Sequence, residues 1–97
     1  MSNGQTYLFK LYIAGETAAS SMHAVANFQR ISDTYFPDNY HLEVIDICKE
    51  PERAIADRII ATPTLVKDFP PPRFKIVGDL SQRFEQVREL FGFARKD

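Results

Sequence analysis

The spacing of apolar residues predicts the first three elements of the chain. Residues 6–13 (TYLFKLYI) form an almost unbroken apolar run, and apolar side chains on both faces are typical of a strand that is covered on both sides of its sheet. Apolar residues then recur at steps of three and four from about 18 to 36, which predicts an amphipathic helix. Residues 41–47 (HLEVIDI) predict a second strand. This order predicts a right-handed parallel crossover.

The second half of the chain predicts a short helix, two strands and a final helix. Pro51 is well placed at the first position of the short helix. Strands are expected over 64–67 and 74–77, followed by a helix with apolar residues along one side over 80–91. The β-α-β-α-β-β-α order is that of the thioredoxin plan. We therefore expect one α/β domain over residues 1–97 with a thioredoxin-like fold.

Composition and charge narrow the class of protein. The chain has 97 residues, 44% of them hydrophobic and 26% charged, which is an ordinary globular balance. Its net charge of −1 gives no overall attraction to nucleic acid or to an anionic membrane. The sequence contains no apolar run long enough to span a bilayer, and its N-terminus does not resemble a secretory signal. A cytoplasmic protein is expected.

Thiol chemistry is the first enzymatic alternative for such a fold. Thioredoxin-like enzymes place a thiolate between the first strand and the first helix, where the helix N-terminus lowers the cysteine pKa. Residues 14–20 read AGETAAS and contain no cysteine. The single cysteine, Cys48, follows the second predicted strand and excludes an intramolecular disulfide. A redox or thiol protein using Cys48 remains the alternative, although a small packing residue is the favoured interpretation.

The other reactive residue types give no recognisable constellation. His23 and His41 have no second ligand at the spacing of a metal site. Asp46 lies between two isoleucines, and a hydrogen-bonded structural carboxylate is the favoured interpretation. The sequence therefore predicts no catalytic residue, metal or cofactor. A fold without a catalytic group is expected to serve by binding a partner.

Five segments, in order, resemble the KaiB family of small regulators of KaiC-type clock ATPases. They are KLYIAGET (10–17), LEVIDICKEPE (42–52), ATPTLVK (61–67), PPP (70–72) and IVGDLS (76–81). The resemblance implies a non-enzymatic protein that binds a KaiC-type ATPase ring. It also implies KaiA or a clock histidine kinase as possible further partners, and a dimeric or tetrameric resting form. It implies neither nucleic-acid nor membrane binding.

The resemblance also implies two alternative folds for the C-terminal half. That half is either αββα, as in thioredoxin, or ααβ, as in resting KaiB. Four prolines lie in this region: Pro63, Pro70, Pro71 and Pro72. Because X-Pro bonds isomerise over tens to hundreds of seconds, we hypothesise that these prolines slow the change of fold. The alternative is that Pro63 is a fixed cis-proline and the triplet ends a strand.

Contact residues can be suggested from charge and aromaticity. Lys67, Arg73 and Lys75 form a basic group around the triple proline and are candidates for contacts to an acidic partner surface. The alternative is a set of solvated charges on an edge hairpin. Tyr7 and Tyr12 in the first strand are candidates for self-association, because aromatic residues are favoured at interfaces. The alternative for both tyrosines is packing within the sheet.

Two positions depart from the family pattern. Glu43 stands where many clock members have a lysine, and His41 where a small residue is usual. If this strand contacts a partner, position 43 presents a negative charge to it where those members present a positive one. The sequence therefore does not decide whether KaiA is a partner. A KaiC-linked role in stress adaptation therefore stands beside a circadian one. A third alternative is a sensor module that resembles the KaiB-like domain of clock histidine kinases.

Overall fold

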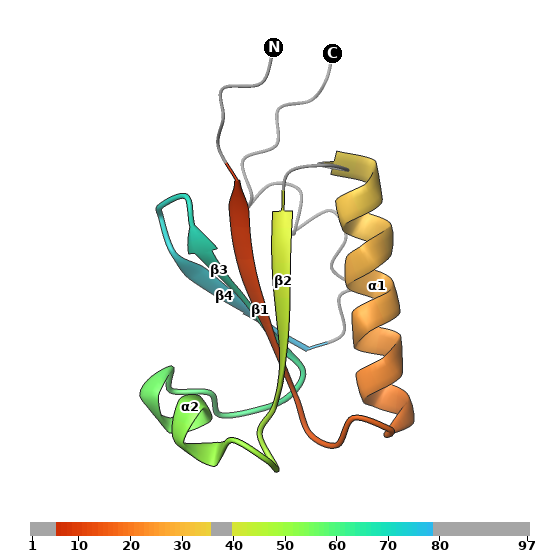
Figure 1. The fold of residues 1–97 in the computed structure, drawn as a ribbon, viewed down its shortest axis with the longest axis vertical. Coiled ribbons are helices and arrows are strands. Elements are labelled where there is room, and N and C mark those ends of the chain that lie inside the picture. The colour runs from red at the N-terminus through yellow and green to blue at the C-terminus, as the bar shows by residue number, and fades with distance from the viewer. Residues whose placement is uncertain (1–5, 36–39, 79–97) are drawn as a thin grey trace.

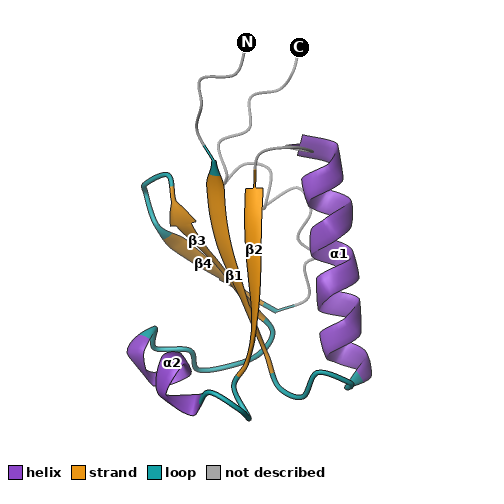
Figure 2. Cartoon of the chain, viewed as in Figure 1, coloured by secondary structure: helices purple, strands orange, loops and turns teal. Residues whose placement is uncertain are grey.

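The computed structural model describes residues 6–35 and 40–78, and the helix predicted over 80–91 lies outside them. The described elements are β1 (Tyr7–Ile13), α1 (Ala19–Tyr35), β2 (Tyr40–Asp46), α2 (Pro51–Ala56), β3 (Thr64–Phe69) and β4 (Phe74–Val77) (Figures 1 and 2). This is the predicted order, and the ends of the four strands and of α1 are displaced by at most two residues. Pro51 opens α2 as expected.

The four strands form one sheet in the order β2-β1-β3-β4. β1 pairs in parallel with β2, so the first strand, helix and second strand make the expected parallel unit. β3 runs antiparallel to both β1 and β4. Of the two C-terminal arrangements considered, the described residues therefore have the helix–strand–strand order of the thioredoxin-like fold.

Each face of the sheet is covered by a separate core cluster. Alternate side chains of a strand point to opposite faces, so Phe9, Leu11 and Ile13 pack against α1, which contributes Phe28 and Ile31. On the other face, a second cluster lies beside α2. Its buried members are Tyr12, Ile45, Ala54 and Val66. The expectation that β1 is covered on both sides is confirmed.

The prolines flank β3. Pro63 lies directly before this strand, and Pro70, Pro71 and Pro72 lie in the connection from β3 to β4. The bonds Thr62–Pro63, Phe69–Pro70 and Pro71–Pro72 are cis. The involvement of these prolines in a slow change of fold stays a prediction.

Candidate functional site

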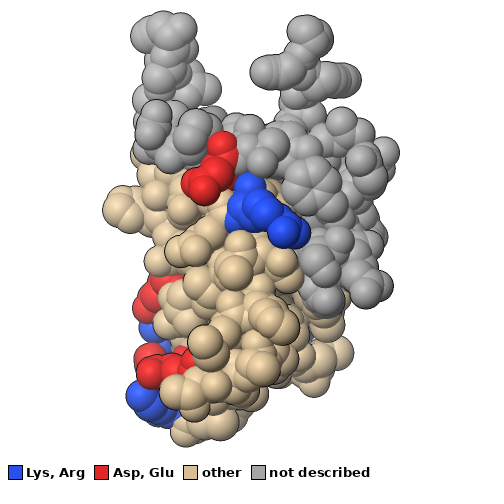
Figure 3. Space-filling view, turned by 90° about the vertical axis from the view of Figure 1, so that its right-hand side faces the viewer, with Lys and Arg blue, Asp and Glu red and all other residues tan. Residues whose placement is uncertain are grey.

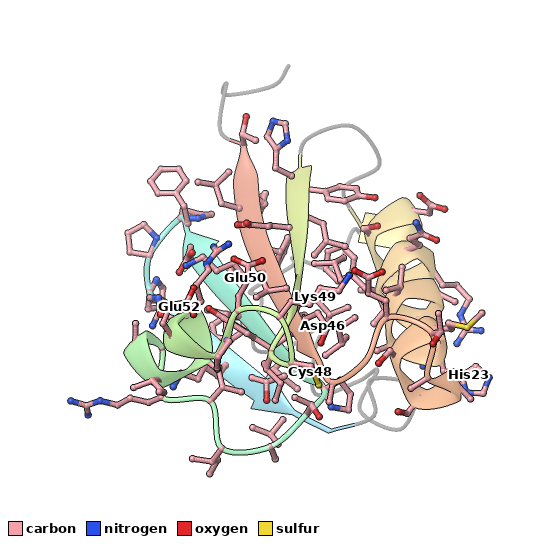
Figure 4. The ribbon with its side chains drawn as sticks, turned by 60° about the horizontal axis from the view of Figure 1, so that its bottom comes forward. His23, Asp46, Cys48, Lys49, Glu50 and Glu52 are labelled. Carbon is pink, nitrogen blue, oxygen red and sulfur yellow. The ribbon has the colours of Figure 1, made fainter. Side chains whose placement is uncertain are left out.

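Asp46 joins the two loops at the carboxyl end of the parallel strands. Its buried carboxylate accepts backbone N–H groups from Gly15 (3.0 Å), Glu16 (3.1 Å) and Cys48 (2.9 Å) (Figure 4). These hydrogen bonds, that from Gly15 first, hold the pKa of Asp46 below its usual value. Asp46 therefore ties the β1–α1 loop to the turn after β2, and its interpretation as a structural carboxylate is confirmed.

Cys48 lies in the turn between β2 and α2, and its side chain is exposed, so its interpretation as a small packing residue is wrong. His23, the other labelled candidate in Figure 4, is exposed on α1 and borders a small cavity of about 120 Å³ with Ser20, Ala24 and Pro63. Across residues 6–35 and 40–78, no three His, Cys, Asp or Glu side chains gather as a metal site.

The structure does not bring Lys67, Arg73 and Lys75 together. Lys67 is only 3% exposed, and its Nζ lies 5.0 Å from the ring centroid of Phe74 and 6.0 Å from that of Tyr7. Both aromatic residues pack against the core cluster that contains Phe9, Phe28 and Ile31, which we call the α1-side core. Lys75 is exposed, and its Nζ donates a hydrogen bond to the carbonyl oxygen of Arg58 (3.3 Å). Of the three, only Arg73 and Lys75 have exposed side chains.

Burial disfavours the charged form of the Lys67 amine. The pKa of Lys67 is therefore lowered below its ordinary value of 10.5. We expect Lys67→Met to raise the free energy of unfolding by about 1 kcal/mol, because a methionine removes the cost of burying a charge. The cost of burying the charged amine of Lys67 applies fully below its folded-state pKa, where the amine is charged in both the folded and the unfolded state. This cost disappears as the pH rises toward 10.5, because the amine then becomes neutral. Urea unfolding from neutral to alkaline pH should show the advantage of Lys67→Met shrinking, and an advantage independent of pH would contradict this account.

The two candidate tyrosines lie in different cores. Tyr7 is half-buried and stacks on Phe9, with ring centroids 6.1 Å apart. Tyr12 is 1% exposed, and its hydroxyl donates to Asp57. Burial first, and then this hydrogen bond, raises the pKa of Tyr12. In this arrangement Tyr12 offers no surface to a second copy. Self-association through Tyr7 and Tyr12 stays a prediction.

A ring of four alternating charges lies over the α2 side of the sheet. Lys10 Nζ lies 3.4 Å from Asp57 Oδ2 and 3.1 Å from Asp68 Oδ2. Arg73 reaches the other oxygen of each carboxylate, with Nη2 2.9 Å from Asp57 Oδ1 and Nε 2.6 Å from Asp68 Oδ1. We call these four residues the charge ring. It joins β1, the end of α2, β3 and the β3–β4 connection.

The surroundings of Asp57 in the charge ring favour its ionised carboxylate. Burial alone would raise the pKa of Asp57, but the Tyr12 hydroxyl and the Lys10 and Arg73 cations outweigh this effect and hold the pKa below its usual value. Sequence reasoning identified Arg73 but missed Lys10, Asp57 and Asp68. These residues lie too far apart in the sequence to form a recognisable motif. Only the ion pair of Asp68 with Arg73 could have been predicted, because both residues belong to one hairpin.

A second charged group fixes the start of α2 to β2. Arg53 binds Glu43 through two bonds, Nη1 to Oε2 at 2.5 Å and Nη2 to Oε1 at 2.9 Å. Its Nη1 also lies 3.4 Å from Glu50 Oε1. The bond from Arg53 lowers the pKa of Glu43. The negative charge that departs from the family pattern is therefore paired within the chain.

An open hollow borders these charges. It has a volume of about 300 Å³ and spans β2, β1 and β3, with Leu8, Phe9, Lys10, His41, Leu42, Glu43 and Asp68 lining it. On the face shown in Figure 3, the described acidic and basic side chains lie next to one another, and none gather into a patch of one sign. None of the described helices is long and apolar enough to cross a membrane.

Residues 10–90 match the KaiB domain. This chain belongs to the KaiB family. The KaiB-family chain is 49% identical over 83 residues to the circadian clock oscillator protein KaiB of Synechococcus sp. (strain RCC307), and the match covers 86% of this chain and 74% of that protein. The protein of the same name from Parasynechococcus marenigrum (strain WH8102) is also 49% identical, with 86% and 79% covered.

Solved structures show the fold of this KaiB-family chain. The N-terminal domain of Synechococcus elongatus SasA superposes with a TM-score of 0.76 at 24% identity, covering 100% of this chain and 93% of that domain. Mitochondrial thioredoxin 3 of Saccharomyces cerevisiae gives a TM-score of 0.67 at 17% identity, covering 89% and 79%. The thioredoxin-like fold predicted for this KaiB-family chain is confirmed.

Proposed function

We propose that this chain is a non-enzymatic clock regulator that binds a KaiC-type ATPase ring and modulates its phosphorylation or output. The observation that carries the proposal is the KaiB match over residues 10–90, supported by curated relatives named as circadian clock oscillator proteins at 49% identity. A binding role needs a stable presented surface rather than a reactive group. The sheet with its two cores supplies such a scaffold.

The partner contact is proposed on the β3–β4 side of the molecule. Lys75 is the cleaner candidate, since its exposed ammonium contacts a carbonyl oxygen and no carboxylate among the described residues. Arg73 is exposed as well, but two carboxylates of the charge ring already hold it. Lys67 is covered, so its proposed share in binding requires a rearrangement that uncovers it.

The proposal is tested by size-exclusion chromatography of this chain with the cognate KaiC-type ATPase and ATP. Samples taken over hours are expected to show a growing fraction of the small protein eluting with the ring. Light scattering of the free protein in the same series reports whether it is a dimer or tetramer. Adding KaiA or a clock histidine kinase to the preformed complex tests these further partners. No co-elution at any time would contradict the proposal.

Charge reversal at Lys75 tests the proposed contact. We expect Lys75→Glu to weaken binding to the ATPase about tenfold, because removing an attractive charge and adding a repulsive one acts across the interface. Arg30→Glu makes a charge change of the same size on exposed α1 and is expected to leave affinity unchanged. Biolayer interferometry measures both variants, with circular dichroism as a check on folding. Equal affinities for Lys75→Glu and the unmodified chain would remove Lys75 from the interface.

A further inference from the structure

Helix α2 is too short to be stable by itself. It has six residues, and isolated helices below about 12–15 residues are marginal in water. Its apolar packing is also slight. Ala54 is its buried member, whereas the side chain of Ile55 is 76% exposed. Contacts other than its own apolar surface must therefore hold α2 on the sheet.

The residue after α2 provides such a contact. Asp57 is the C-cap of the helix, and its carboxylate accepts from the Tyr12 hydroxyl, from Lys10 Nζ (3.4 Å) and from Arg73 Nη2 (2.9 Å). The Tyr12 hydroxyl also lies 3.4 Å from the carbonyl oxygen of Arg53, within α2. Side chains from β1 and from the β3–β4 connection thus converge on the carboxyl end of this helix.

The surface beneath α2 is apolar. Tyr12, Ile45 and Val66 are 1%, 0% and 0% exposed, and Ala54 of α2 packs on them with Ile47 and Ile59 from the flanking turns. These three side chains come from β1, β2 and β3, so the apolar surface continues across three strands. Displacing α2 and its turns would uncover it while leaving the α1-side core intact.

We propose that residues 47–63, with α2 at their centre, form a lid over this second core, and that Asp57 is the latch of the lid. The lid opens independently of α1 and the sheet. Two of the contacts of Asp57 are ion pairs whose cations are partly exposed, 25% for Lys10 and 43% for Arg73. Salt screens exposed charges more than buried ones, so ionic strength is expected to shift the lid toward its open state.

Hydrogen exchange followed by NMR on the full chain tests this lid. The reporter amides are those of Asp57, which donates to the Arg53 carbonyl (3.1 Å), and Ile59, which donates to the Ala54 carbonyl (2.9 Å). Tyr12→Phe removes the hydroxyl donor without opening a cavity, and Asp57→Ala removes the latch. Both are expected to accelerate exchange at the reporter amides about tenfold or more, with β1 and α1 amides unchanged. Raising NaCl from about 0.05 M to about 0.5 M should act in the same direction on the unmodified chain.

Asp33→Ala is the matched control. It also removes one negative charge, but from an exposed position on α1 that takes no part in the charge ring. Exchange at Asp57 and Ile59 is expected to stay unchanged in this variant. The lid is refuted if Tyr12→Phe accelerates reporter, β1 and α1 amides by the same factor, or accelerates none of them. It is also refuted if Asp33→Ala has the same effect as Tyr12→Phe. Should Asp57→Ala fail to fold, Tyr12→Phe decides.

Discussion

Phe28→Ala is expected to lower the free energy of unfolding by about 3–5 kcal/mol, the largest effect of any substitution considered for this chain. Phe28 is 0% exposed at the centre of the α1-side core. Its ring makes edge-to-face contacts with Phe9 at 4.9 Å and with Tyr40 at 5.5 Å between centroids. The substitution removes these contacts and leaves a cavity between α1 and strands β1 and β2.

Urea unfolding followed by circular dichroism measures this loss. Met22→Ala on the same helix is the matched control, since the side chain of Met22 is 59% exposed and its truncation should change the free energy by no more than about 0.5 kcal/mol. A loss at Phe28 as small as that at Met22 would show that α1 does not pack on the sheet as described.

Asp46→Ala is expected to give the second largest effect, a fall in Tm on the order of 10 °C. The carboxylate accepts three backbone N–H groups from two different loops. Without it, these donors lose their partner, and Gly15 and Glu16 are no longer held beside the turn after β2. Asp46→Asn keeps one acceptor oxygen and should lose less than the alanine variant. Asp33→Ala, at an exposed position on α1, is the control and should leave Tm nearly unchanged.

The stabilisation by Asp46 should depend on pH. Its folded-state pKa lies below the ordinary value of 3.8, chiefly because of the N–H of Gly15, so the ionised form is favoured in the folded state. The stabilisation is therefore complete above the unfolded-state pKa and is lost as the pH falls through the folded-state pKa. Scanning calorimetry from about pH 7 to about pH 2 should show the Tm of the unmodified chain approaching that of Asp46→Asn only at the acidic end. A constant difference in Tm across this range would contradict the role of the ionised carboxylate.

Much of the fold could be predicted from local patterns. The apolar run at 6–13 is two-sided because core clusters cover both faces of β1, one on the α1 side and one beside α2, and the three- and four-residue spacing after it marks the face that α1 buries. Strand alternation also indicates from the sequence that Lys67 and Lys75 cannot form one basic group. Lys67 pairs with Phe74, whereas Lys75 pairs with Val66, so the two lysines point to opposite faces of the hairpin.

The sequence by itself determined the family, the order of the described elements, the buried face of α1 and the two apolar faces of β1, because each of these is written in short-range spacing or in contiguous motifs. Only the tertiary structure decided which charges meet. Lys10, Asp57, Asp68 and Arg73 form one ring because β3 lies beside β1 and the end of α2 lies over both. Such contacts depend on strand order and register, which local hydrophobic patterns do not specify.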